Sequence, residues 1–212
     1  MKHPSTYFKK FGISNAILKQ YIVETEDIPD HPFSVIYPYT NGSRKICSPF
    51  GSKKWRVDTS GKTSLAQDVS AVLFGYDQLP ETGETVILTG GEKDVLTFHS
   101  LEISAICLNS ETASIPPKLI HELKSRFSNV LICYDTDETG IKQAKKFSKE
   151  HKIINLILPK DFEGKDISDF MASGRTKDDF YEILKSTLSN QNDTKPYYTG
   201  FDIYNLKVGN ED

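Results

Sequence analysis

Between residues 85 and 188, short apolar runs alternate with longer segments in which apolar residues recur at helical spacing. Short runs rich in apolar and β-branched residues are typical of buried strands, whereas spacing of three or four residues is typical of amphipathic helices. We expect strands at residues 86–89, 103–108, 130–134 and 154–158, with helices after them. This alternation predicts an α/β fold, with a four-stranded parallel sheet flanked by helices.

Residues 1–80 have a different pattern, typical of a small α+β unit. Ser14 is suited to cap a short helix, and the segments 34–39 and 43–50 flank Asn41-Gly42, a strong signal for a β-hairpin. We therefore predict three parts: an N-terminal subdomain (1–80), an α/β domain (81–189), and a tail, linker or partner-binding segment (190–212).

The composition excludes several classes of protein. Of the 212 residues, 37% are hydrophobic and 26% are charged, as in ordinary soluble domains. No apolar run is long enough to cross a membrane and residues 1–10 lack a signal-peptide core, so we expect a cytoplasmic protein without a membrane partner. The three cysteines form no C-x-x-C pair, which argues against a zinc ribbon or a disulfide framework.

A net charge of −3 excludes a globally basic nucleic-acid binder, although a local basic patch is present. Basic residues mixed with aromatic ones suit phosphate contacts and base stacking. The alternative is an ordinary solvated hairpin surface. The predicted nucleic-acid- or nucleotide-binding residues are Arg44, Lys45, Lys53, Lys54, Trp55 and Arg56.

Acidic residues follow each of the four predicted strands. Ligands bind beyond the carboxyl ends of parallel strands, so these side chains are expected at one edge of the sheet. They are Glu92 and Asp94, then Glu111, then Asp135 and Asp137, and finally Asp166 and Asp169. Neighbouring carboxylates repel one another, and Mg²⁺ is the usual cation that holds them ionised. Alternatively, some of these acids only begin helices.

Three of these segments resemble the motifs of the Toprim domain of bacterial and phage-type DNA primases. They are G-G-E-K-D at 90–94, D-T-D-E-T-G at 135–140 and K-D-I-S-D at 165–169. Looser likeness at 53–56 and 73–80 extends the resemblance over roughly residues 5–188. The resemblance implies a Toprim-type four-stranded parallel sheet preceded by the small N-terminal subdomain.

The resemblance also implies an activity, namely metal-dependent nucleotidyl transfer that makes primers on single-stranded DNA during replication. Nucleoside triphosphates would be the substrates, a replicative helicase acting in trans a partner, and a phage or mobile element the source. Mg²⁺ (or Mn²⁺) would be held by Asp135, Asp137 and Asp166. The residues expected to take part in catalysis are Glu92, Asp94, Glu111, Asp135 and Asp137.

One departure from the family pattern concerns the first motif, which in primases reads E-G-x-x-D. Alignment on Asp94 places Gly90 at the leading position, where the family has a glutamate. Either Glu92 or Glu111 is expected to substitute for it. Two alternatives stay open: a Toprim nuclease, and a non-catalytic nucleic-acid-binding module.

Overall fold

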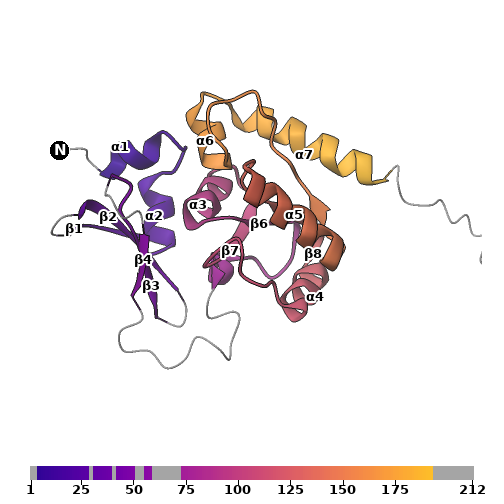
Figure 1. The fold of residues 1–212 in the computed structure, drawn as a ribbon, viewed down its shortest axis with the longest axis horizontal. Helices are drawn as coiled ribbons and strands as arrows, with labels where there is room; N and C mark the ends of the chain where they lie inside the picture. Colours follow the sequence, from indigo (N-terminus) through magenta and orange to yellow (C-terminus); the bar gives the residue numbers. More distant parts are fainter. Residues whose placement is uncertain (1–3, 29–30, 40–41, 51–54, 59–72, 193–212) are drawn as a thin grey trace, which may run out of the picture. The chain divides into compact units, whose positions relative to one another are not determined.

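The computed structural model describes residues 4–28, 31–39, 42–50, 55–58 and 73–192, and Figure 1 shows their order along the chain. The chain divides into two compact units, residues 1–177 and residues 178–212. Two separate β-sheets belong to the first unit. The predicted tail at 190–212 lies outside the described residues from position 193 onward.

The N-terminal part of the first unit consists of two short helices and an antiparallel sheet. The elements are α1 (Pro4–Lys9), α2 (Asn15–Gln20), β1 (Glu24–Ile28), β2 (His31–Pro38), β3 (Arg44–Cys47) and β4 (Trp55–Asp58), with sheet order β1-β2-β3-β4. Ser14 caps α2 as expected, since its side chain accepts a hydrogen bond from the Ile17 N–H. The predicted hairpin is the antiparallel pair β2 and β3.

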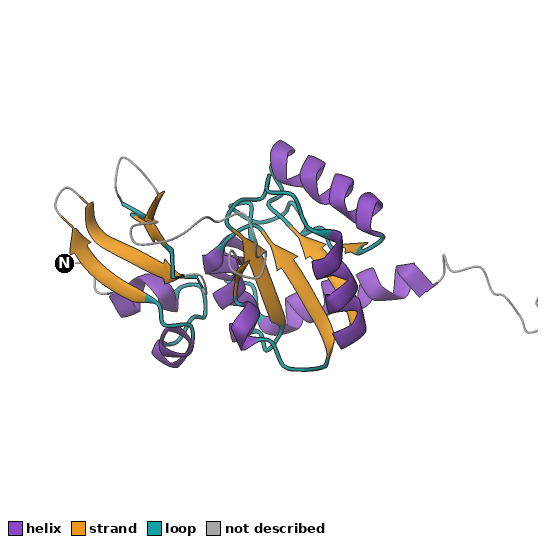
Figure 2. Cartoon of the chain, turned by 90° about the horizontal axis from the view of Figure 1, so that it is seen from below, coloured by secondary structure: helices purple, strands orange, loops and turns teal. Residues whose placement is uncertain are grey.

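The second sheet has five strands in the order β5-β7-β6-β8-β9. Figure 2 shows helices lying beside the strands of this sheet. They are β5 (Leu73–Phe74), β6 (Gly83–Thr89), β7 (Ser104–Leu108), β8 (Phe127–Cys133) and β9 (Ile154–Asn155). β6, β7, β8 and β9 are parallel, which confirms the predicted fold class. β5 adds an antiparallel edge strand, so this sheet begins before residue 81.

Helices cover this sheet because alternate strand residues present apolar side chains to both of its faces. The helices of the first unit are α3 (Glu92–Ser100), α4 (Pro117–Arg126), α5 (Glu138–His151) and α6 (Ile167–Ala172), and a 3₁₀ turn, η2 (Tyr76–Gln78), follows β5. Leu123 of α4 and Phe147 of α5 pack in one core with Leu88 and Ile132 of the sheet. α3 packs against β7 and α6 instead.

The second unit contains α7 (Lys177–Asn192), the last helix that the sequence predicts. In the described part of the chain, no helix combines the length and apolar character needed to cross a membrane.

The register of the parallel strands positions the site. Thr89, the last residue of β6, pairs with Cys107 of β7 and with Cys133, the last residue of β8. The three central strands therefore end at nearly the same level. Side chains that follow them along the chain consequently meet at one edge of the sheet.

Candidate metal centre

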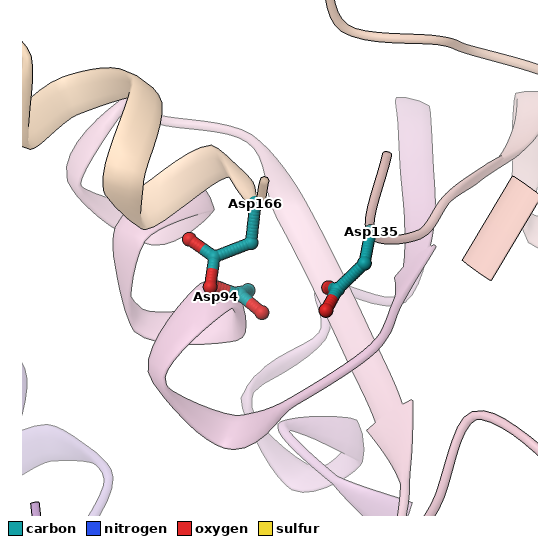
Figure 3. A group of neighbouring side chains, drawn as sticks. All are labelled: Asp94, Asp135 and Asp166. Carbon is teal, nitrogen blue, oxygen red and sulfur yellow. The ribbon is translucent and has the colours of Figure 1, made fainter. Parts of the chain in front are cut away.

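Three aspartates meet at that edge, as Figure 3 shows. Asp94 lies in the first turn of α3, Asp135 follows β8 directly after Tyr134, and Asp166 is the N-cap of α6. One carboxylate oxygen of each lies within 4.8 Å of those of the other two. Three segments far apart in the sequence thus bring their acidic groups to one point.

Hydrogen bonds hold two of these aspartates in place. Ser168 of α6 donates to Oδ1 of Asp94 at 2.5 Å, and its hydroxyl also lies 2.9 Å from that of Thr97 on α3. Asp166 accepts from the Asp169 N–H at 2.7 Å, which satisfies one of the donors at the start of α6. α3 and α6 are therefore tied together beside the cluster, and each of these two aspartates is held by a hydrogen bond from α6.

Asp135 depends on a close approach of the chain at Gly140. A Cβ at position 140 would overlap the Asp135 carbonyl oxygen and lie 2.9 Å from the Asp135 Cβ. Only glycine leaves room for this approach. The spacing D-x-D-x-x-G therefore has a steric cause in this fold.

Burial and the repulsion of nearby carboxylates raise the pKa values of Asp94 and Asp135. Burial raises the pKa of Asp94 to about 7, and the Asp166 carboxylate adds to the effect. Burial likewise raises the pKa of Asp135 to about 6, against the lowering effect of Lys165, and the Glu111 carboxylate raises it further. Ionised carboxylates this close together need a cationic partner.

Two lysines supply positive charge to the aspartates. The Lys93 ammonium lies 3.4 Å from Asp94 Oδ1 and 3.2 Å from Asp166, and the Lys165 ammonium lies 2.5 Å from Asp135. Burial lowers the pKa of each lysine, but the surrounding carboxylates raise it by more, so both remain charged. The sequence did not predict either lysine as part of the site.

The donor set fits a hard divalent cation. Carboxylate oxygens are the ligands that Mg²⁺ and Mn²⁺ prefer, and Mg²⁺ is usually held by one or two carboxylates together with waters and substrate phosphates. Asp94, Asp135 and Asp166 supply such oxygens within reach of one ion. A divalent ion at this point would also offset the repulsion among them more strongly than one ammonium group does.

Asp137, the other acid of the D-x-D pair, has different partners. Its Oδ1 accepts from the Gly140 N–H at 2.9 Å as the N-cap of α5, and its Oδ2 lies 2.7 Å from the Lys165 ammonium. Among the described residues, the aspartate cluster contains Asp94 and not Asp137. The role of Asp137 as a metal ligand stays a prediction.

Glu92 is buried and binds partners from the N-terminal sheet. It accepts hydrogen bonds from the Tyr39 hydroxyl and, at 3.0 Å, from the Lys45 ammonium. Burial lowers the pKa of Lys45, but the Glu92 carboxylate more than offsets this and keeps the ammonium charged. Lys45, predicted to bind nucleic acid, is thus already paired inside the protein.

Glu111 does reach the aspartate cluster. Its Oε1 accepts a hydrogen bond from the Asp135 N–H at 3.2 Å, and its carboxylate lies beside Gly90. Of the two acids expected to substitute for the missing glutamate, Glu111 is the one beside the cluster.

The predicted basic patch is only partly described. Arg44 begins β3, and Trp55 and Arg56 belong to β4, where they pair with Cys47 and Ile46. Lys53 and Lys54 lie outside the described residues. The contribution of this patch to nucleic-acid binding therefore stays a prediction.

The segment that carries the aspartates matches a known family. Residues 87–171, which include Asp94, Asp135 and Asp166, match the family model described as Toprim-like. This segment is similar to Toprim domains. The match confirms the resemblance found in the sequence motifs. No curated protein matches the sequence.

Solved structures extend the likeness beyond the Toprim-like domain. One is the bacteriophage T7 lagging-strand DNA polymerase with the primase domains of two gp4 subunits (21% identity, 82% of this chain and 88% of that chain covered, TM-score 0.62). Another is the E. coli primase catalytic core (16% identity, 90% of this chain and 78% of that chain covered, TM-score 0.63). A third is the DnaG primase catalytic domain bound to single-stranded DNA (14% identity, 90% of this chain and 76% of that chain covered, TM-score 0.62). The chain therefore has the fold of a primase catalytic core.

Proposed function

We propose that this protein is a primase-like nucleotidyltransferase that joins nucleotides on a single-stranded DNA template during DNA replication. The observation that carries the proposal is the meeting of Asp94, Asp135 and Asp166 in a Toprim-like domain within a primase-core fold. A metal centre of oxygen ligands at the end of a parallel sheet is suited to phosphoryl-transfer chemistry.

The chemistry is mainly positioning and charge stabilisation. Asp94, Asp135 and Asp166 would hold Mg²⁺ or Mn²⁺, which would neutralise triphosphate charge and lower the pKa of the attacking hydroxyl. Lys165, whose side chain is 51% exposed and which also pairs with Asp137, would give up Asp135 to such a cation and would then lie near the substrate phosphates. Lys93 keeps Asp166 in place from the side of α3.

Nucleic acid, nucleotides and a helicase are the proposed partners. The T7 structure contains an RNA/DNA hybrid and dTTP, and the DnaG catalytic domain is bound to single-stranded DNA. Another T7 structure of similar fold is the primase fragment of a primase-helicase protein, which supports a functional link to a helicase. The cytoplasm is the proposed compartment, where template and nucleotides are available.

The basic patch leads to a prediction about salt. If Lys53, Lys54 and Arg56 bind phosphates, changing all three to alanine should make the salt dependence of single-stranded DNA binding shallower. The slope of log K against log salt should fall by about 0.7 for each phosphate that the variant no longer binds. Fluorescence anisotropy of a labelled oligonucleotide at several salt concentrations measures this slope.

A charge-matched control separates this local effect from net charge. Lys142, Lys145 and Lys149 are exposed on α5, so their triple alanine variant removes the same total charge elsewhere. The control should retain the parent slope. Equal slopes for the parent and the patch variant would instead indicate that these residues contact no phosphates and form an ordinary solvated surface.

The activity itself is tested with Mg²⁺ or Mn²⁺, labelled nucleoside triphosphates and single-stranded DNA. Labelled products that grow in length with time, and that require the metal, are expected. Shortened DNA would favour the Toprim nuclease, and binding without any reaction would favour the non-catalytic module.

A further inference from the structure

The side chain of Glu111 crosses the end of one strand to reach another. β6 lies between β7 and β8 in the sheet, and Glu111 follows β7, whereas its hydrogen-bond partner Asp135 follows β8. The carboxylate must therefore pass over the end of β6. Gly90 is the residue at that end, directly after Thr89.

Gly90 leaves the space that this crossing requires. A Cβ at position 90 would overlap Oε1 of Glu111 and lie 3.0 Å from both its Cδ and its Cγ. The neighbouring Gly91 is not restricted in this way, because a Cβ there would meet only Asp94 Oδ2, at 3.4 Å. Glu111 can therefore occupy this position only because residue 90 has no side chain.

Glu111 brings a carboxylate group to the edge of the aspartate cluster, where no described residue forms an ion pair with it. Among the described residues, the Asp135 N–H is the hydrogen-bond donor to its carboxylate, and none of the ion pairs includes it. This bond engages Oε1, and Glu111 as a whole is only half-buried. A carboxylate held in this way is suited to accept a proton beside a metal-bound substrate.

We propose that Glu111 is a catalytic residue, entering from β7 into the space above Gly90 that another side chain would fill. The inference rests on the proposed nucleotidyl transfer. In that step the attacking hydroxyl passes its proton to Oε2 of Glu111, and its oxygen bonds to the α-phosphorus of the nucleotide. The bond from that phosphorus to the bridging oxygen breaks, and pyrophosphate leaves.

The geometry can be tested without activity, by NMR of the metal-free protein. Gly90→Ala should displace the Glu111 carboxylate and shift the Asp135 amide resonance, as Glu111→Ala should, because both remove the same hydrogen bond. Gly91→Ala is the matched control and should leave that resonance in place. If the chemical shift of the Asp135 amide is the same in the parent, Gly90→Ala and Glu111→Ala, Glu111 does not reach Asp135 over Gly90.

The catalytic role is tested by moving the carboxylate. Glu111→Gln should lower the rate of nucleotide joining by about 10²–10⁴-fold, the usual contribution of a general base, with Mn²⁺ affinity within about threefold of the parent. Gly90→Glu combined with Glu111→Ala should recover at least about tenfold over Glu111→Ala, since a carboxylate again occupies the same space. A structural role would not allow this rescue.

The outcomes separate this inference from the proposed function. An active parent with an equally active Glu111→Gln variant overturns the role of Glu111 and leaves nucleotidyl transfer standing. A parent that joins no nucleotides under any metal overturns both, whatever the NMR shows of the crossing.

Discussion

Replacement of Asp94 and Asp135 together by asparagine should remove divalent-cation binding and nucleotide joining. These residues supply two of the three carboxylates that meet at the centre, and neutral amides are much weaker ligands for Mg²⁺ and Mn²⁺. We expect Mn²⁺ affinity to fall by more than about 100-fold and the rate of joining by about 10³-fold, since a catalytic metal supplies several kcal/mol of charge stabilisation. Calorimetry and the joining assay measure the two effects.

Two controls make this prediction specific. Asp161→Asn changes an exposed aspartate that pairs with Arg175 outside the cluster, and it should leave Mn²⁺ affinity unchanged. Asp137→Asn should weaken Mn²⁺ binding far less than the double variant, because Asp137 caps α5 instead of joining the cluster. Equal losses for Asp137→Asn and the double variant would favour the ligand set expected from the sequence.

Lys45→Met should strongly destabilise the protein. It leaves the buried Glu92 carboxylate, whose side chain is 6% exposed, without its cationic partner. Removal of one partner of a buried ion pair typically costs about 3–5 kcal/mol. Urea unfolding of the variant should therefore show a loss of free energy of unfolding in this range.

The double variant Lys45→Met with Glu92→Gln identifies the cause. It removes the uncompensated charge, and the Tyr39 hydroxyl can still donate to the amide oxygen, so more than half of the lost stability should return. Lys145→Met, at an exposed position on α5, should stay within about 0.5 kcal/mol of the parent. A stable Lys45→Met protein with weakened DNA binding would instead favour the nucleic-acid contact expected from the sequence.

The parallel sheet could be predicted because its signal is local. Each of the four strands is a short apolar run that ends before an acidic segment, so their parallel arrangement and the edge that gathers the acids follow from general rules. β5 could not be predicted in the same way. Its two residues gain their strand conformation by pairing with β7, more than thirty positions along the chain.

The choice between Asp94 and Asp137 depends on the path of the chain after β8. In an extended strand, Asp135 and Asp137 would point to the same side. Instead, Thr136 donates from its N–H to the Lys165 carbonyl oxygen at 2.8 Å, and the chain turns into α5. Asp137 therefore faces the start of the helix. This turn depends on a contact between segments about thirty residues apart, so the pattern of residues does not reveal it.

Long-range pairing also explains why the roles of the two glutamates could not be separated from the sequence. Glu92 and Glu111 both follow strands of the sheet, yet Tyr39 and Lys45 bind the first and the Asp135 N–H binds the second. These partners lie 24 to 53 residues away in the chain. The sequence does show that residue 90 is a glycine where the primase motif has a glutamate, and this makes Glu92 and Glu111 candidates to replace that carboxylate.

The most direct test of the metal centre is anomalous diffraction from crystals of the full chain grown with Mn²⁺. A manganese peak is expected at about 2.1 Å from carboxylate oxygens of Asp94, Asp135 and Asp166, with the Lys165 ammonium displaced from Asp135. A peak bound elsewhere, or no peak while Lys93 and Lys165 remain paired with the aspartates, would contradict the proposed centre.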